Sequence, residues 1–194
     1  MTHSKKRIAI FISGRGSNMK AIAEQAQNGI LKNCCEIVLV FSNKAAAKGL
    51  QTASEMGIKT AFIGSKGKKR QTFDQQVIDF VETFNLDYIV LAGYMRILSP
   101  LFTRYFAKKI INIHPADTRL HQGLHAYEWA FDTKRKQTCI TVHFVNEGVD
   151  TGEIIAQQTV DLNDVQSLEE VEIRGLKTEH WFYSEVLRDL FEQN

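Results

Sequence analysis

Asn112 and His114 stand two residues apart in the segment Asn112-Ile-His-Pro115, at the end of an apolar, β-branched run. Residues two apart on a strand point to the same face, so the Asn112 amide and the His114 imidazole would project side by side. Two adjacent N–H donors could stabilise a developing oxyanion, as acyl transfer requires. The alternative is a polar pair whose hydrogen bonds are simply satisfied at a strand end.

Asp150 lies in the glycine-flanked loop Gly148-Val-Asp-Thr-Gly152, which follows another strand-like run. A carboxylate there could orient or charge a histidine, or relay a proton through water. An aspartate between glycines is also common in turns for purely local reasons. His143 would share a strand face with Thr141, and a buried histidine bonded to the backbone is its simplest interpretation.

The loop Ser13-Gly-Arg-Gly-Ser-Asn18 joins an apolar run to a helical pattern. In an open α/β sheet, ligands bind beyond the carboxyl ends of the strands, where a helix N-terminus offers free N–H groups to an anion. Gly16 would let the backbone approach closely, and Ser17 or Asn18 could cap the helix. The loop has neither the Gly-Lys-Ser of a Walker loop nor a third glycine. It predicts either a phosphate site or a tight turn.

Other chemistries find less support in the residues. His121 and His125 have helical zinc-ligand spacing, but no HExxH motif occurs, so we predict no metal site. Ser17 does not lie in a nucleophile elbow of the G-x-S-x-G type. The basic run at residues 66–70 is typical of a solvated loop, with phosphate handling as the alternative.

Length and composition fit one globular domain, since the chain has 194 residues, 44% hydrophobic and 24% charged. The net charge of +2 is too small to argue for nucleic acid. No apolar run approaches the roughly 20 residues that span a bilayer. Three cysteines without CxxC spacing suggest reduced thiols. We therefore expect a cytoplasmic protein whose partners are small molecules, with no nucleic acid and no membrane.

Apolar runs alternate with helix-period segments along the chain. We expect strands at residues 7–13, 36–42, 59–63, 88–94, 110–114, 139–145 and 154–160. We expect helices at residues 18–27, 45–56, 72–84, 99–106, 126–132 and from 167 onward, where Ser167 and Glu170 have capping-box spacing. The alternation predicts an α/β fold, a Rossmann-like doubly wound domain with helices on both faces. Its sheet of about seven strands should be mostly parallel, with an antiparallel C-terminal edge.

The order of these motifs resembles that of the formyltransferase superfamily, and in particular its phosphoribosylglycinamide formyltransferase branch. The motifs are the loop at 13–18, Phe-Ser-Asn-Lys at 41–44, Leu-Ala-Gly-Tyr-Met-Arg-Ile-Leu-Ser-Pro at 91–100, Asn-Ile-His-Pro at 112–115, Val-His-Phe-Val at 142–145 and Val-Asp-Thr-Gly at 149–152. The resemblance covers nearly the whole chain, from about Arg7 to the final helix. It implies transfer of a formyl group from 10-formyltetrahydrofolate to the amine of glycinamide ribonucleotide, in purine synthesis and without a metal.

The resemblance also implies roles for individual residues. Asn112 and a protonated His114 would stabilise the tetrahedral oxyanion, and Asp150 would assist proton transfer. The implied ribonucleotide contacts are Gly16, Ser17 and Asn18 in the phosphate loop, Arg70 near the phosphate, and Glu179. The implied folate contacts are Met95, Arg96, Ile97, Leu98, Asn112 and His143. Within one domain spanning residues 1–194, the phosphate-binding half would cover about 7–110 and the catalytic, folate-binding half about 111–194.

One loop departs from the pattern of the family. After Asn-x-His-Pro the family usually continues Ser-Leu-Leu-Pro and then aromatic-Pro-Gly, whereas residues 116–125 read Ala-Asp-Thr-Arg-Leu-His-Gln-Gly-Leu-His. Gly123 and His125 keep their places, two prolines are gone, and Asp117 and Arg119 are new. A loop without those prolines has more freedom in the unfolded state.

Because this loop would border the amine substrate, the acceptor stays open. The alternatives are a formyltransferase acting on a sugar nucleotide, a hydrolase of 10-formyltetrahydrofolate, or a folate- or nucleotide-binding protein without catalysis. A sugar enzyme usually carries a C-terminal extension, and the hydrolase an N-terminal regulatory domain. Retention of Asn112, His114 and Asp150 argues against the non-catalytic alternative. Either a monomer or a homodimer would fit.

Overall fold

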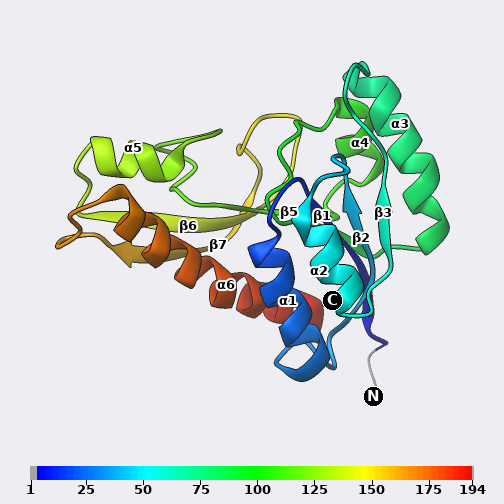
Figure 1. Ribbon diagram of the computed structural model, residues 1–194, viewed down its shortest axis with the longest axis horizontal. Coiled ribbons are helices and arrows are strands. Elements are labelled where there is room, and N and C mark those ends of the chain that lie inside the picture. Colours follow the sequence, from blue (N-terminus) through cyan, green and yellow to red (C-terminus); the bar gives the residue numbers. More distant parts are fainter. Residues whose placement is uncertain (1–3, 194) are drawn as a thin grey trace.

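The computed structural model describes residues 4–193, which form a seven-stranded sheet of order β3-β2-β1-β4-β5-β6-β7 (Figure 1). β1 to β5 are parallel, and β6 and β7 extend the sheet as antiparallel strands. The strands are β1 (Lys6–Ile12), β2 (Cys35–Ser42), β3 (Thr60–Phe62), β4 (Tyr88–Leu91), β5 (Ile110–His114), β6 (Gln137–Phe144) and β7 (Ile154–Asp161). The mostly parallel sheet with an antiparallel C-terminal edge is confirmed.

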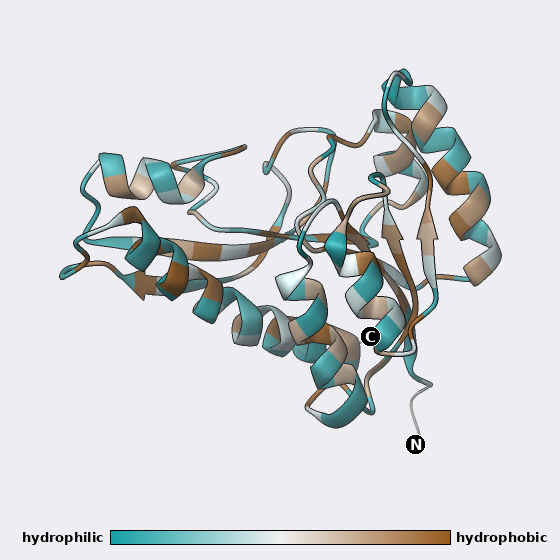
Figure 2. Cartoon of the chain, in the orientation of Figure 1, coloured by the Kyte–Doolittle hydropathy of each residue, from teal (hydrophilic) through white to brown (hydrophobic). Residues whose placement is uncertain are grey.

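Helices cover both faces of the sheet, because alternate residues of its strands are buried on opposite sides. Ile8, Ile10 and Ile12 pack with α1, α2, α5 and α6, whereas Ala9 and Phe11 pack with α3 and α4. Figure 2 shows the apolar residues concentrated along the central strands. The helices are α1 (Ser17–Asn28), α2 (Lys48–Glu55), α3 (Arg70–Val81), α4 (Pro100–Tyr105), α5 (Ala126–Asp132) and α6 (Leu168–Gln193), with a 3-10 turn η1 (Glu82–Phe84).

Several element ends differ from the sequence predictions for local reasons. The fourth strand stops at Leu91 instead of continuing to Tyr94, because the chain turns at Gly93 with a φ of 73°. The second helix begins at Lys48 and not at Ala45, since the chain first makes a turn. At the start of α6, Ser167 Oγ accepts the Glu170 N–H at 3.2 Å, as the capping-box spacing predicts.

The start of α1 is set by backbone geometry. Its N-cap is Gly16, with a φ of 78° and no side-chain capping bond, so the prediction that Ser17 or Asn18 caps the helix is wrong. A Cβ on Gly16 would lie only 2.9 Å from the Cα of Gly49 in α2. Gly49 also donates its N–H to the Gly14 carbonyl at 3.1 Å. The loop therefore needs glycine both for its φ and for this close approach.

Two further findings concern membrane-spanning segments and cysteines. Among the residues that the structure describes, no helix is long and apolar enough to cross a membrane. Cys34, Cys35 and Cys139 are free thiols.

Candidate active site

Asn112 and His114 lie at the carboxyl end of β5, and both contact Asp150 from the loop between β6 and β7. The Asn112 Nδ2 is 3.2 Å from Asp150 Oδ1, and the His114 Nδ1 is 3.3 Å from Asp150 Oδ2. The side chains of His114 and Asp150 are 5% and 12% exposed. The strand periodicity and the glycine-flanked loop thus bring Asn112, His114 and Asp150 together, and these three residues are called the triad below.

His143 completes this cluster from the neighbouring strand. It pairs with Asn112 across the antiparallel β5–β6 ladder, and its Nε2 lies 3.2 Å from Asn112 Nδ2. Its Nδ1 lies 2.8 Å from the Phe144 carbonyl, which can only accept, so the proton of a neutral ring resides on Nδ1. Nε2 then accepts from Asn112. The expected backbone-bonded histidine is present, and it also fixes the catalytic candidate beside it.

Asp150 owes its position to unusual backbone geometry. Its φ is 49°, a left-handed conformation that aspartate tolerates better than most residues. A Cβ on Gly152 would fall 1.6 Å from the Phe144 carbonyl oxygen, so only glycine lets the loop return this close to β6. Burial alone would raise the pKa of the Asp150 carboxyl, but the His143 and His114 rings and the Gly123 N–H outweigh it and lower that pKa.

His114 is held between two acceptors. Its Nδ1 faces the Asp150 carboxylate and its Nε2 lies 3.1 Å from the His121 carbonyl, so only the imidazolium could donate to both. Burial nevertheless lowers the pKa of His114, and the Asp150 charge and the His121 carbonyl offset this only in part. Burial therefore favours the neutral ring, whereas the two neighbouring acceptors favour the protonated ring that the resemblance implied.

An NMR titration should find the pKa of His114 below its usual 6.5, because the buried ring resists charging. In Asp150→Asn the pKa should fall further, since the opposing carboxylate charge is gone. Because the pKa of His114 is lower in the folded state, the unfolded chain binds this proton more tightly. The free energy of unfolding is therefore unaffected by His114 above pH 6.5 and decreases as the pH falls below that value. A wild-type pKa above 6.5 would contradict this assignment.

The predicted phosphate loop presents its backbone to solvent but turns one side chain inward. Gly14 and Ser17 are exposed, whereas Asn18 is buried and donates from Nδ2 to Glu179 Oε2 at 2.5 Å. Glu179, buried in α6, also accepts the Tyr127 hydroxyl hydrogen. Burial raises the pKa of the Glu179 carboxyl, although both donors oppose the shift. Two predicted ribonucleotide residues thus lie in direct contact, and Tyr127, which the sequence gave no reason to single out, joins them.

The segment 95–98 lies beside the same loop. Ser13 Oγ, at the end of β1, accepts the Met95 N–H at 2.8 Å and donates to Asn43 at 2.6 Å. The Met95 residue is 59% exposed and Ile97 is 50% exposed, so both side chains are accessible to a ligand. Leu98 is buried in the core, so its side chain is not available to a ligand and only its backbone remains.

The basic residues of this region contact α3 and the loop before it, or solvent. Arg96 stacks on Phe73, with its guanidinium 4.6 Å from the ring centroid, and donates to the Lys68 carbonyl. Arg70 is exposed at the first position of α3. Within residues 4–193, no hydrogen bond or ion pair connects Arg70 with the phosphate loop, so its placement near the phosphate stays a prediction.

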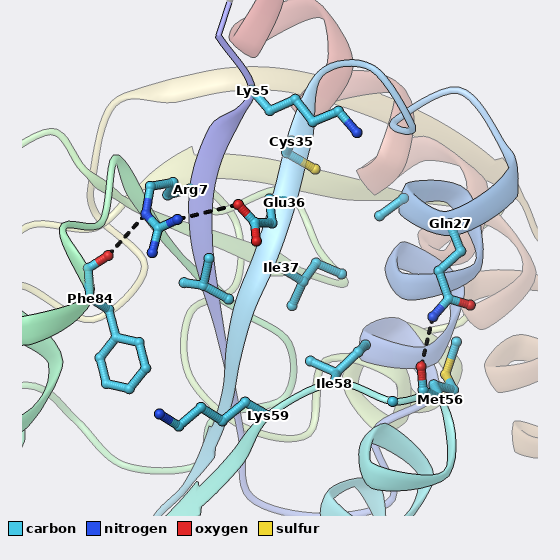
Figure 3. Close-up of a pocket in the computed structure, with 13 residues that line it drawn as sticks. Lys5, Arg7, Gln27, Cys35, Glu36, Ile37, Met56, Ile58, Lys59 and Phe84 are labelled. Carbon is cyan, nitrogen blue, oxygen red and sulfur yellow. Dashed lines mark hydrogen bonds and ion pairs between the residues drawn. The ribbon is translucent and has the colours of Figure 1, made fainter.

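A groove lies at the opposite end of the sheet from these residues. It has a volume of about 570 Å³ and is lined near the start of β1 and β2 by Arg7, Cys35 and Glu36 (Figure 3). Arg7 there is bound to Glu36 and to the Phe84 carbonyl. None of the predicted site residues lines this groove. In the described part of the chain, no group of three or more His, Cys, Asp or Glu is placed to hold a metal.

Comparisons with known proteins identify the family of the chain. The family model described as formyl transferase matches residues 6–187. The chain is 39% identical over 184 residues to the phosphoribosylglycinamide formyltransferase of Haemophilus influenzae, covering 94% of this chain and 86% of that protein. It is 36% identical over 188 residues to the trifunctional purine biosynthetic protein adenosine-3 of Drosophila melanogaster, covering 96% of this chain but spanning only 14% of that longer protein.

A solved structure has the same fold. The crystal structure of phosphoribosylglycinamide formyltransferase from Bacillus halodurans superposes with a TM-score of 0.90 at 34% identity, covering 95% of each chain. The predicted Rossmann-like α/β class is thereby confirmed.

Proposed function

The chain belongs to the formyl transferase family, and from this premise we propose that it moves a formyl group from 10-formyltetrahydrofolate to the amine of glycinamide ribonucleotide, in cytoplasmic purine biosynthesis. The observation that carries the proposal is the buried cluster of Asn112, His114 and Asp150 at the carboxyl end of β5. The exposed, glycine-rich start of α1 supports a phosphorylated acceptor, because its free N–H groups favour an anion. Residues 1–194 then act as one formyltransferase domain.

In the reaction, the acceptor amine forms a bond to the formyl carbon, and the formyl oxygen becomes an oxyanion. Asn112 donates an amide N–H to this oxyanion. Both hydrogens of that amide face acceptors, His143 Nε2 and Asp150 Oδ1, at 3.2 Å each. One of these bonds must therefore yield as negative charge develops on the oxygen.

His114 and Asp150 handle the proton. The neutral His114 ring can take the proton that the attacking nitrogen releases, because the new oxyanion offsets the cost of charging a buried imidazole. Asp150, ionised and bonded on both oxygens, orients the ring and stabilises its charged form. The same proton then passes to N10 of the folate, directly or through water, as the bond between the formyl carbon and N10 breaks. The step needs no covalent enzyme intermediate.

The remaining site residues serve the two substrates. We assign the acceptor phosphate to the backbone of Gly16 and Ser17, with Arg70 near it, and the glycinamide portion to Asn18 and Glu179. The folate would lie along Met95, Arg96, Ile97, the Leu98 backbone and the Asn112–His143 pair. The exposure of Met95 and Ile97 supports this side for the folate.

A formyl-transfer assay tests the proposal. Purified protein is mixed with 10-formyltetrahydrofolate, with and without glycinamide ribonucleotide, while the folate absorbance is followed. We expect turnover that requires the ribonucleotide. Asn112→Ala protein purified identically controls for contaminating host enzyme.

Two outcomes would contradict the proposal. Turnover without the ribonucleotide would mean hydrolysis of the formyl folate. Folate binding without turnover in either mixture would mean that the site formylates another amine.

A further inference from the structure

We infer that Asp117 and Arg119 form a positioning pair, which holds the loop of residues 116–123 in place against His114 and Asp150. The loop joins β5 to α5 (Figure 1). The inference rests on the proposed function and adds to it two residues that would touch neither substrate nor the reacting atoms.

The loop contacts both catalytic candidates through its main chain. The His121 carbonyl lies 3.1 Å from His114 Nε2, and the Gly123 N–H donates to Asp150 Oδ2 at 2.9 Å. The His121 ring also stacks on His114, with centroids 6.1 Å apart and planes 7° from parallel. These contacts use main-chain groups, which every residue type except proline provides. The path of the loop therefore decides whether the His121 carbonyl and the Gly123 N–H reach the triad.

Asp117 and Arg119 fix that path at its start. Asp117 Oδ1 accepts the Arg119 N–H at 3.0 Å and its Nε at 2.9 Å, and Oδ2 accepts the guanidinium at 2.8 Å. The Asp117 carbonyl accepts the N–H groups of Leu120 and His121 at 2.8 and 3.0 Å. A forked pair combined with this turn leaves the three residues before His121 little freedom.

The pair is also attached to the sheet. The Arg119 guanidinium donates to Gln157 on β7 at 3.2 Å, and Gln157 donates to the Thr141 hydroxyl on β6 at 2.9 Å. Thr141 in turn donates to the Ala116 carbonyl at 2.7 Å. These bonds lead from the loop through two strands and back to the first residue of the loop, so the pair sets the loop relative to the sheet that carries His114.

Stability alone does not account for such a pair. The Arg119 side chain is 69% exposed, and exposed ion pairs contribute about 0–1 kcal/mol to stability. Asp117 is only 15% exposed, and Arg119 lowers its pKa to about 2, so the pair stays charged at any working pH. Residues 116–125 contain no proline, so the forked ion pair restrains a loop that no proline ring stiffens.

The test compares Arg119→Ala with Arg174→Ala. Arg174, on α6, is a matched control. It likewise binds an aspartate, Asp164, and it donates to the Asp161 carbonyl at the end of β7, which is the end of that strand away from the triad. In Arg119→Ala we expect kcat to fall about 10- to 100-fold, since small misplacements of catalytic groups have effects of this order. KM for both substrates should stay within about threefold, and Arg119→Lys should recover part of the lost kcat.

Amide hydrogen exchange gives a readout that needs no substrate. Exchange of the Gly123 N–H should be at least 10-fold faster in Arg119→Ala, while amides of β5 keep their wild-type rates. If that variant does not fold, Asp117→Asn, which keeps one acceptor oxygen, takes its place. Unchanged Gly123 exchange, or an unchanged kcat in a folded variant, would overturn the inference. An inactive wild type would refute the proposed function, and the exchange measurement would still decide the role of the pair.

Discussion

Replacing Asp150 by asparagine should lower kcat by roughly 10²–10⁴-fold, the range that general acid–base groups contribute. The carboxylate has four neighbours. Oδ1 accepts from Asn112 and lies 3.5 Å from His143 Nε2, while Oδ2 accepts the Gly123 N–H and faces His114 Nδ1. Asparagine offers one acceptor oxygen, and its amide would donate toward His114, reversing the polarity of that contact. The imidazolium that forms during the reaction would then have no counter-charge.

The Asp150→Asn substitution removes the negative charge without changing the conformation of the loop. Asparagine tolerates the left-handed φ of 49° as aspartate does, so the loop should keep its course. Asp164→Asn is a suitable control, because Asp164 also has a lowered pKa but is exposed beyond the far end of β7. Steady-state kinetics on both variants decide the matter. An Asp150→Asn enzyme within about threefold of the wild-type kcat would remove Asp150 from proton transfer.

Much of the architecture could be predicted from local patterns. The run at residues 8–12 is apolar at every position, and the run that ends at His114 is apolar except at Asn112 and His114. Such runs are typical of strands buried on both faces, and both belong to the parallel part of the sheet. The strand period then placed Asn112 and His114 on one face without any knowledge of the tertiary structure. The glycines beside Asp150 indicated a turn, and Gly152 proved necessary for the loop to return to β6.

What could not be predicted depends on contacts between distant segments. The contacts of the His121 carbonyl and the Gly123 N–H are made by main-chain groups, so the types of these residues do not reveal them. Asn18 was expected at the helix cap, but burial against Glu179, 161 residues away, determines where its side chain lies. The charge of His114 follows from the balance between burial and the nearby carboxylate, and neither quantity can be calculated from sequence alone.

Asn112→Ala should lower kcat by roughly 10²–10³-fold, as removal of a single oxyanion donor does. The Asn112 amide makes bonds of 3.2 Å to His143 Nε2 and Asp150 Oδ1, and the bond to the Asp150 oxygen is longer than the usual N–H···O optimum. They can therefore hold the amide in place and still yield one hydrogen to the oxyanion. If the interaction exists only in the transition state, kcat and kcat/KM should fall by the same factor, with KM unchanged.

The variant should remain folded, which keeps this result interpretable. Alanine would leave His143 Nε2 and Asp150 Oδ1 without their donor, at an expected cost of about 1–3 kcal/mol in the free energy of unfolding. Urea denaturation measures that cost separately from the kinetics. Gln27→Ala is the matched control, because it deletes an amide that donates to the Met56 carbonyl at 2.8 Å in the remote groove (Figure 3). If Asn112→Ala lost no more activity than Gln27→Ala, the donor to the oxyanion would have to be sought elsewhere. The His114 ring, once it has taken the proton of the attacking amine, would be the group left at the end of β5 to supply it.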